Sequence, residues 1–136
     1  MGSKSYENGK KGERIVSDFL CQRRYWVHNV QRRPNGSQPV DIIALKENTS
    51  LLLDAKYVNA SKKDYFPFSD VQSDQETSME YAIEYASLEN VGFAIVLEID
   101  EQNPRYLDYC DYIRVRYEEG KEGVRALNLP LLEDIA

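Results

Sequence analysis

The spacing of apolar residues along the chain predicts two helices. Over residues 7–24, one helical face is formed by Ile15, Val16, Phe19 and Leu20. Residues 69–87 form the second predicted helix, opened by a capping box in which Ser69 is followed three residues later by Gln72. Its predicted core-facing stripe consists of Val71, Met79, Ala82, Ile83 and Ala86. Both segments therefore offer one apolar face to a core.

The remaining apolar runs predict strands. These runs cover residues 26–30, 40–45, 51–58, 92–99 and 111–117. Residues 32–39 are rich in Pro, Asn, Gly and Ser and predict a loop, whereas the short stretch 46–50 joins two strands as a hairpin. The tail, 126–135, fits neither period. The order helix, three strands, helix, two strands predicts a mixed α/β sheet flanked by helices, in a single domain over residues 1–136.

Composition fits a protein of this class, and its charge is unevenly distributed. The 136 residues carry a net charge of −6, but residues 1–63 hold 12 Lys and Arg against 6 Asp and Glu. Residues 64–136 hold 5 against 17. The basic half is compatible with binding a polyanion, because the local field matters more than the total charge. A solvated surface with no such partner is the plainer alternative.

Location follows from what the sequence lacks. No run of about 18 apolar residues is present, so no membrane span is expected. The first residues lack the apolar middle of a signal peptide, which predicts a cytoplasmic protein. Cys21 and Cys110 are too few and too far apart for a zinc motif or a disulfide framework, and we expect two reduced thiols.

The strand 51–58, LLLDAKYV, carries two charges among apolar residues. Asp54 and Lys56 lie two positions apart, so their side chains share one face of the strand. Asp41 begins the preceding strand, and a hairpin would place it beside Asp54. Two adjacent carboxylates repel one another unless a proton or a cation lies between them. Hard oxygen ligands suit Mg²⁺, for which Mn²⁺ can substitute, and Lys56 would then be a fixed positive charge beside the metal.

Two polar residues on the predicted helices point to the same site. Glu13 borders the apolar stripe of the first helix, and Gln75 lies on the core-facing stripe of the second, where it needs a hydrogen-bonding partner. Each residue also has a structural interpretation. Asp54 and Lys56 would suit an ion pair on an exposed strand, Glu13 a solvated helix surface, and Gln75 a bond to a backbone carbonyl.

These residues resemble a known motif. Glu13, then PVD ending at Asp41, then DAK at 54–56, is similar to the PD-(D/E)XK nuclease superfamily, and within it to the RecU-type Holliday-junction resolvases. The likeness covers roughly residues 9–99. It is carried by residues 54–75, with the acidic-Ala-Lys motif, an aromatic-Pro step at Phe66–Pro67, and Gln75. Residues 36–41, GSQPVD, resemble the matching element of archaeal resolvases, which implies that Ser37 lies near the metal.

The resemblance implies a restriction-endonuclease-like fold and a metal-dependent endonuclease that hydrolyses phosphodiester bonds in DNA. It implies that Asp41, Asp54 and the carbonyl of Ala55 hold Mg²⁺, with Glu13 helping directly or through water. Lys56 would position the attacking water, supported by Gln75. Basic residues around the site would hold the DNA backbone: Lys10, Lys11, Arg23, Arg24, Arg32, Arg33, Lys62 and Lys63. An enzyme that cuts two strands symmetrically is expected to be a homodimer.

Two features differ from RecU proteins. Asp54 stands where that family usually has Glu, and residues 29–40 leave no room for the stalk that RecU proteins insert before the catalytic Asp. A restriction-type or repair nuclease, of phage or mobile-element origin, therefore remains an alternative with the same chemistry. A third alternative is a non-catalytic module that binds nucleic acid or a protein on a nuclease fold. The intact set of Glu13, Asp41, Asp54 and Lys56 favours the enzymes.

Overall fold

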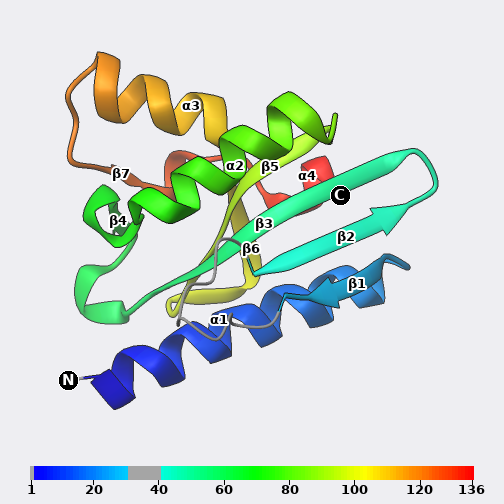
Figure 1. Cartoon of the computed structure of the whole chain (residues 1–136). Helices are drawn as coiled ribbons and strands as arrows, with labels where there is room; N and C mark the ends of the chain where they lie inside the picture. Colours follow the sequence, from blue (N-terminus) through cyan, green and yellow to red (C-terminus); the bar gives the residue numbers. More distant parts are fainter. Residues whose placement is uncertain (1, 31–40) are drawn as a thin grey trace.

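The fold is built on a mixed sheet. The computed structural model of the chain describes residues 2–30 and 41–136, with side chains from residue 7 onward. Within these residues lies a five-stranded sheet of order β1-β2-β3-β5-β6 (Figure 1). Its strands are β1 (Trp26–Asn29), β2 (Ile42–Lys46), β3 (Thr49–Val58), β5 (Asn90–Leu97) and β6 (Asp100–Asp108). β3 and β5 are parallel and the other neighbours antiparallel, so the predicted mixed α/β architecture is confirmed.

Helices cover both faces of this sheet (Figure 1). One face carries α1 (Gly2–Gln22) and the short α4 (Leu132–Ile135). The opposite face carries α2 (Ser73–Tyr85), α3 (Tyr109–Ile113) and a π-helical segment, Arg114–Glu118. A second, two-stranded sheet, β4 (Tyr65–Pro67) and β7 (Gly123–Arg125), packs on that same face. We call the two faces the α1 face and the α2 face.

Strand β3 divides the core into two parts. Leu51, Leu53 and Ala55 are buried toward α1, whereas Leu52 points toward α2. Because side chains alternate along a strand, the pair Asp54 and Lys56 also faces α2, as the sequence predicts. The backbone of β3 therefore separates Asp54 and Lys56 from the aliphatic side of the sheet.

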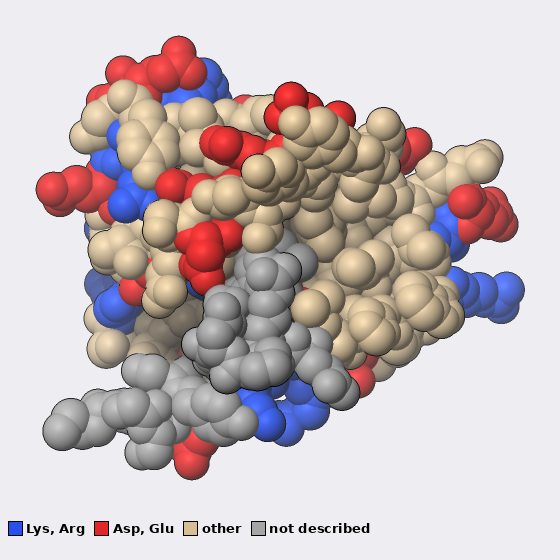
Figure 2. Space-filling model, in the orientation of Figure 1, with Lys and Arg blue, Asp and Glu red and all other residues tan. Residues whose placement is uncertain are grey.

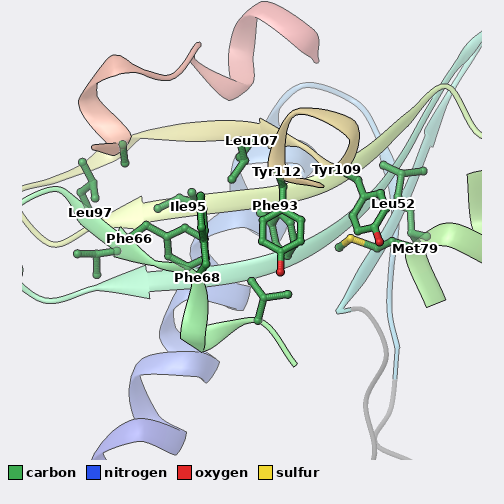
Figure 3. Packing of buried hydrophobic residues seen from close by; sticks show 14 residues of the cluster. Leu52, Phe66, Phe68, Met79, Phe93, Ile95, Leu97, Leu107, Tyr109 and Tyr112 are labelled. Atoms are coloured by element: carbon green, nitrogen blue, oxygen red, sulfur yellow. The ribbon is translucent and has the colours of Figure 1, made fainter. Parts of the chain in front are cut away.

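The two cores differ in composition. Against α1 the core is largely aliphatic, and the predicted stripe is confirmed, with Val16 and Leu20 fully buried. Against α2 it is aromatic, and Phe93 and Tyr112 stack edge to face with ring centroids 5.0 Å apart (Figure 3). Phe68 meets Tyr112 in the same way at 5.2 Å. Such contacts fix ring orientation as well as burying area.

The prediction of a strand over residues 111–117 is wrong. That segment is helical, because Tyr109 and Tyr112 are both buried at a spacing of three, and Asp108 caps the helix by accepting a hydrogen bond from the backbone N–H of Cys110 at 3.1 Å. The strand on the outer side of β5 is β6, which the sequence analysis did not predict. Its first half is polar and contains Pro104, a residue that an edge strand tolerates because one side of its backbone needs no partner.

The second helix is shorter than predicted. α2 begins at Ser73 with Gln72 as its N-cap, and the capping box joins Gln72 to Gln75. Ser69 lies instead in a 3₁₀ turn, Phe68–Asp70. The predicted apolar stripe is confirmed at Met79, which is fully buried, but Ile83 is 40% exposed and Ala86 is exposed.

Two further expectations concern the cysteines and membrane-spanning helices. In the described residues Cys21 and Cys110 are exposed free thiols. Within the same ranges, no helix is both long and apolar enough to cross a membrane.

Candidate active site

The hairpin places the carboxylates of Asp41 and Asp54 side by side where β2 begins. Asp41 directly precedes β2, and its backbone N–H donates to the carbonyl of Leu53 at 3.1 Å, which extends the pairing by one residue. The next residue along β3 is Asp54. The side chain of Asp41 turns back onto β3, where its Oδ2 accepts a hydrogen bond from the N–H of Ala55 at 2.7 Å. The predicted neighbourhood of Asp41 and Asp54 is thus formed by the strand register.

Asp54 is the most unusual side chain of the core. It is only 1% exposed, on a strand whose neighbouring residues Leu51, Leu52, Leu53 and Ala55 are apolar and buried. The ammonium of Lys56 lies 2.8 Å from its Oδ2, but that ammonium donates its hydrogen bonds to the carbonyl of Asp70 at 2.9 Å and to Oε1 of Gln75 at 3.2 Å. Asp54 Oδ2 thus lies in a buried ion pair with Lys56, although it accepts no hydrogen bond of regular geometry from the described residues. The ammonium offsets the charge of this oxygen, and its remaining lone pairs are open to a further ligand.

The electrostatics of Asp41 reflect the same crowding. Burial, and after it the neighbouring charge of Asp54, raise the pKa of the Asp41 carboxyl to about 9, whereas the hydrogen bond from Ala55 opposes the rise. A more distant contribution comes from Glu13. The two aspartates therefore cannot both be ionised cheaply, and near neutral pH the pair retains a proton unless a cation replaces it.

The donor atoms suit a hard divalent cation. Both aspartates present carboxylate oxygens, and Asp54 Oδ2 accepts no hydrogen bond of regular geometry from the described residues. Ala55 contributes a third oxygen, because the N–H and C=O of one strand residue point to the same side, and its N–H points to Asp41. All-oxygen sites of this kind hold Mg²⁺ or Mn²⁺. Within the described residues, however, no group of three or more His, Cys, Asp or Glu side chains converges closely enough to hold a metal by itself.

Glu13 approaches from the other face of the sheet. Its Oε1 accepts a hydrogen bond from Asn29 Nδ2 at 3.1 Å, and the same Nδ2 lies 2.9 Å from Ser17 Oγ. Glu13 also lines a shallow pocket of about 300 Å³ together with Lys10 and Arg14. The structure therefore places Glu13 near the aspartates without bringing its carboxylate into their cluster.

Gln75 has the hydrogen-bonding partners that its place on a core-facing helical stripe requires. Its Oε1 accepts from Lys56 Nζ and, at 3.1 Å, from the backbone N–H of Gln72, so one oxygen both caps α2 and holds the lysine. The carbonyl of Asp70 was missed, because a backbone acceptor leaves no mark in a sequence. Asn29, which holds Glu13, was missed as well, since a polar residue at the end of a strand is unremarkable by itself.

The predicted DNA-binding residues divide into three groups. Lys10, Arg24, Lys62 and Lys63 are exposed. Two others are held by acids, since Lys11 lies 3.1 Å from Glu101 and Arg23 lies 3.6 Å from Glu133. The third group, Ser37, Arg32 and Arg33, lies outside the described residues. On the α2 face acidic atoms gather around α2, and the surface over β1 and β2 carries few charges (Figure 2).

Comparison with known proteins bears on the fold. No family model and no curated protein matches the sequence. Among solved structures, the chain is similar to Hjc, a Holliday junction resolvase from the archaeal hyperthermophile Archaeoglobus fulgidus, with a TM-score of 0.56 and 18% identity. The match covers 75% of this chain and 78% of that one. At this identity the likeness shows a common fold, and it confirms the fold that the sequence resemblance implies.

Proposed function

We propose that this protein is a divalent-metal-dependent endonuclease that hydrolyses phosphodiester bonds in DNA, with a resolvase-like role in recombination or repair. The observation that carries the proposal is the buried Asp54 carboxylate beside Asp41, 2.8 Å from an ammonium that neighbouring groups hold in place. The shared fold with a Holliday junction resolvase supports this function.

In this proposal each residue has a distinct task. Asp41, Asp54 and the carbonyl of Ala55 hold Mg²⁺ or Mn²⁺, and Glu13 contributes through a water molecule. The cation supplies a Lewis acid that stabilises negative charge on the phosphate and on the leaving oxygen. Lys56 keeps an N–H directed at the reacting groups, where it orients the attacking water or a phosphate oxygen. Gln75 and the carbonyl of Asp70 fix the direction of that ammonium.

DNA binding would be electrostatic. Contacts to the DNA backbone give affinity without sequence preference. The residues proposed to make them are Lys10, Lys11, Arg23, Arg24, Lys62 and Lys63, with Arg32, Arg33 and Ser37. A homodimer with twofold symmetry would present two such sites to two strands of a junction. The acidic half of the chain would then lie away from the DNA or at the dimer surface, in a protein that works in the cytoplasm.

The test is a cleavage assay with labelled four-way junction, linear duplex and single-stranded DNA, each in Mg²⁺, Mn²⁺ and EDTA, with Asp54→Ala as the control protein. Paired symmetric nicks in the junction, lost in EDTA and in Asp54→Ala, are expected. Metal-dependent cutting of linear DNA instead would keep the nuclease and replace the resolvase role with the restriction-type alternative. Retained activity in Asp54→Ala would contradict the proposed site. No cutting of any substrate would contradict the proposed enzyme and favour a non-catalytic binding module.

A further inference from the structure

The orientation of Lys56 depends on one short segment. Within the described residues, the two hydrogen bonds that Lys56 donates go to the carbonyl of Asp70 and the carboxamide of Gln75. Both acceptors belong to residues 70–75, the turn into α2. Any shift of this turn relative to β3 would move both acceptors together and redirect the ammonium.

This turn is held from behind by residues far along the chain. Glu76 follows Gln75 directly, and its Oε2 accepts hydrogen bonds from the phenols of Tyr112 at 2.5 Å and Tyr117 at 2.6 Å. The guanidinium of Arg116 lies 3.5 Å from the same oxygen. One carboxylate oxygen thus collects three donors from α3 and the π-helical segment. We call Glu76, Tyr112, Arg116 and Tyr117 the rear clamp.

Arg116 reaches the turn at a second point. Its Nη1 donates to the carbonyl of Val71 at 3.4 Å and also to the Tyr112 hydroxyl. Val71 follows Asp70, just as Glu76 follows Gln75. Residues of α3 and the π-helical segment therefore bind Val71 and Glu76, and each of these directly follows one of the two residues that accept hydrogen bonds from Lys56.

The π-helical geometry makes the rear clamp possible. In a regular α-helix two positions five apart are separated by about 140° around the axis, so Tyr112 and Tyr117 would diverge. The wider turn, in which the N–H of Glu119 bonds to the carbonyl of Arg114 at 2.9 Å, returns the chain to the same side after five residues. π-Helical turns are rare and often occur at functional sites.

The members of the rear clamp are anchored in the aromatic core. Tyr112 is fully buried between Phe68 and Phe93, as Figure 3 shows, so its hydroxyl has little freedom. Burial, and then the hydrogen bond to Glu76, raise the pKa of the Tyr112 phenol, which therefore remains a donor at neutral pH. The Glu76 and Arg116 side chains are 17% and 28% exposed, and partial burial strengthens their attraction.

We propose that Glu76 and Arg116 are positioning residues for Lys56, because they fix the turn whose Asp70 carbonyl and Gln75 carboxamide hold the lysine ammonium. The rear clamp contains neither a proposed metal ligand nor a DNA-binding residue, so its effect on cleavage passes through Lys56. This inference rests on the proposed nuclease function for its consequence on cleavage, and on the structure alone for its consequence on Lys56.

The chain offers a matched pair of variants to test this. Arg116→Met removes the guanidinium of the rear clamp. Arg114→Met removes a guanidinium two residues away in the same π-helical segment. Among described residues Arg114 pairs with Asp111 of α3 at 3.4 Å and with Glu119, directly after the segment, at 2.5 Å, so both partners are close to it in sequence. Both variants lose one positive charge, so their electrostatic effects on DNA binding are matched. The comparison needs three quantities for each protein: melting temperature, DNA affinity in EDTA, and single-turnover cleavage rate.

Arg116→Met is expected to cut about 10- to 100-fold more slowly than Arg114→Met, because a displacement of about 1 Å at a catalytic group has effects of this size. Its DNA affinity should stay within about twofold of that of Arg114→Met. Equal cleavage rates in the two variants, with both proteins folded, would overturn the inference.

A second readout follows Lys56 without any cleavage. In ¹⁵N-lysine spectra, an ammonium held by two acceptors exchanges its protons slowly, and Lys56→Arg identifies its signal. The Lys56 signal should persist in Arg114→Met and broaden or shift in Arg116→Met. An unchanged Lys56 signal in Arg116→Met would overturn the inference. If the Lys56 signal behaves as expected in the two variants but the wild-type protein cuts no DNA, the proposed function is contradicted and the inference about Lys56 is kept.

Another pair guards against misfolding of Arg116→Met. Glu76→Gln weakens the centre of the rear clamp, whereas Glu80→Gln weakens a bond between the same two helices one turn further along, where Tyr109 donates to Glu80 at 2.9 Å. The same ordering is expected, with Glu76→Gln slower and Glu80→Gln close to wild type. The reverse ordering would contradict the inference.

Discussion

The two faces of the sheet have different roles, although β3 contributes side chains to both. On the α1 face, β3 contributes Leu51, Leu53 and Ala55 to an aliphatic core under a long regular helix. On the α2 face, the intervening residues include Asp54 and Lys56, under aromatic rings, short turns and a π-helical segment. Within β3, neighbouring residues therefore belong either to the scaffold or to the site.

This difference explains where a buried charge can be tolerated. An aliphatic core offers no hydrogen-bonding groups, and a carboxylate there would remain unsatisfied. The α2 face brings backbone carbonyls, a carboxamide and several phenols to the same depth. A site of opposed charges can form on that face because its irregular elements supply polar atoms at defined positions.

The largest expected effect comes from removing the charge of Lys56. Lys56→Met should lower the cleavage rate by about 10²- to 10⁴-fold, the range for loss of a group that assists proton transfer. Affinity for Mn²⁺ should be kept or increased, because an ammonium 2.8 Å from Asp54 competes with a cation. Single-turnover kinetics and Mn²⁺ titration check the two parts. Loss of Mn²⁺ binding in this variant would contradict the assigned roles.

Substitution of Leu53, which lies beside Asp54 but on the α1 face, should affect stability and leave cleavage unchanged. Leu53 is fully buried in the aliphatic core, and Leu53→Ala should lower the free energy of unfolding by about 2–5 kcal/mol. The cleavage rate per folded molecule should be unchanged well below the melting temperature. Urea denaturation and cleavage at low temperature separate the two effects. A folded Leu53→Ala protein that has lost cleavage would show that the faces are not independent.

A pH-dependent prediction follows from Asp41. Its folded-state pKa is raised above the ordinary value of 3.8, so the folded protein keeps a proton that the unfolded chain releases. That contribution to stability is complete below about pH 4 and is lost as the pH rises toward 9. Metal-free protein should therefore lose stability over this window, and Mg²⁺ should bind more tightly, by at most about tenfold per pH unit.

Thermal melts in EDTA and in Mg²⁺, at about pH 6 and about pH 8, measure this coupling. Asp41→Asn is the control, because it removes the titrating carboxyl and should show a smaller change of melting temperature between the two pH values in EDTA than the wild-type protein. A wild-type protein whose Mg²⁺ stabilisation does not grow with pH would contradict the coupled aspartate pair.

The smallest effect is expected at the surface. Lys62 is exposed in a 3₁₀ turn, Ala60–Lys62, just beyond the end of β3 that bears Lys56. Lys62→Ala should reduce the salt dependence of DNA binding by about one phosphate contact, a change of about 0.9 in the logarithmic slope. Lys46 is the control, because it pairs with Thr49 at the opposite end of the hairpin. Equal slopes for Lys62→Ala and Lys46→Ala would remove Lys62 from the DNA-binding surface.

The sequence predicted which candidate residues lie near one another on β2 and β3 better than it predicted the elements around them. Asp41, Asp54 and Lys56 lie on a regular hairpin, where the alternation of side chains and a short turn determine which residues meet. Gln75 was found because a polar residue on a buried helical face needs a partner. The fold of residues 100–118 was missed, because β6 is half polar and the following tyrosines, read as alternating, are buried at helical spacing. The rear clamp could not be predicted, since it depends on that helix and on its π-helical turn.

The most direct test of the metal site is anomalous scattering from crystals soaked in Mn²⁺, compared between wild type and Asp54→Asn. A single peak between Asp41 and Asp54, beside the carbonyl of Ala55, is expected in the wild-type protein and should be absent in the variant. The same peak in both proteins, or peaks confined to the acidic surface of α2, would show that the buried aspartates do not hold the metal.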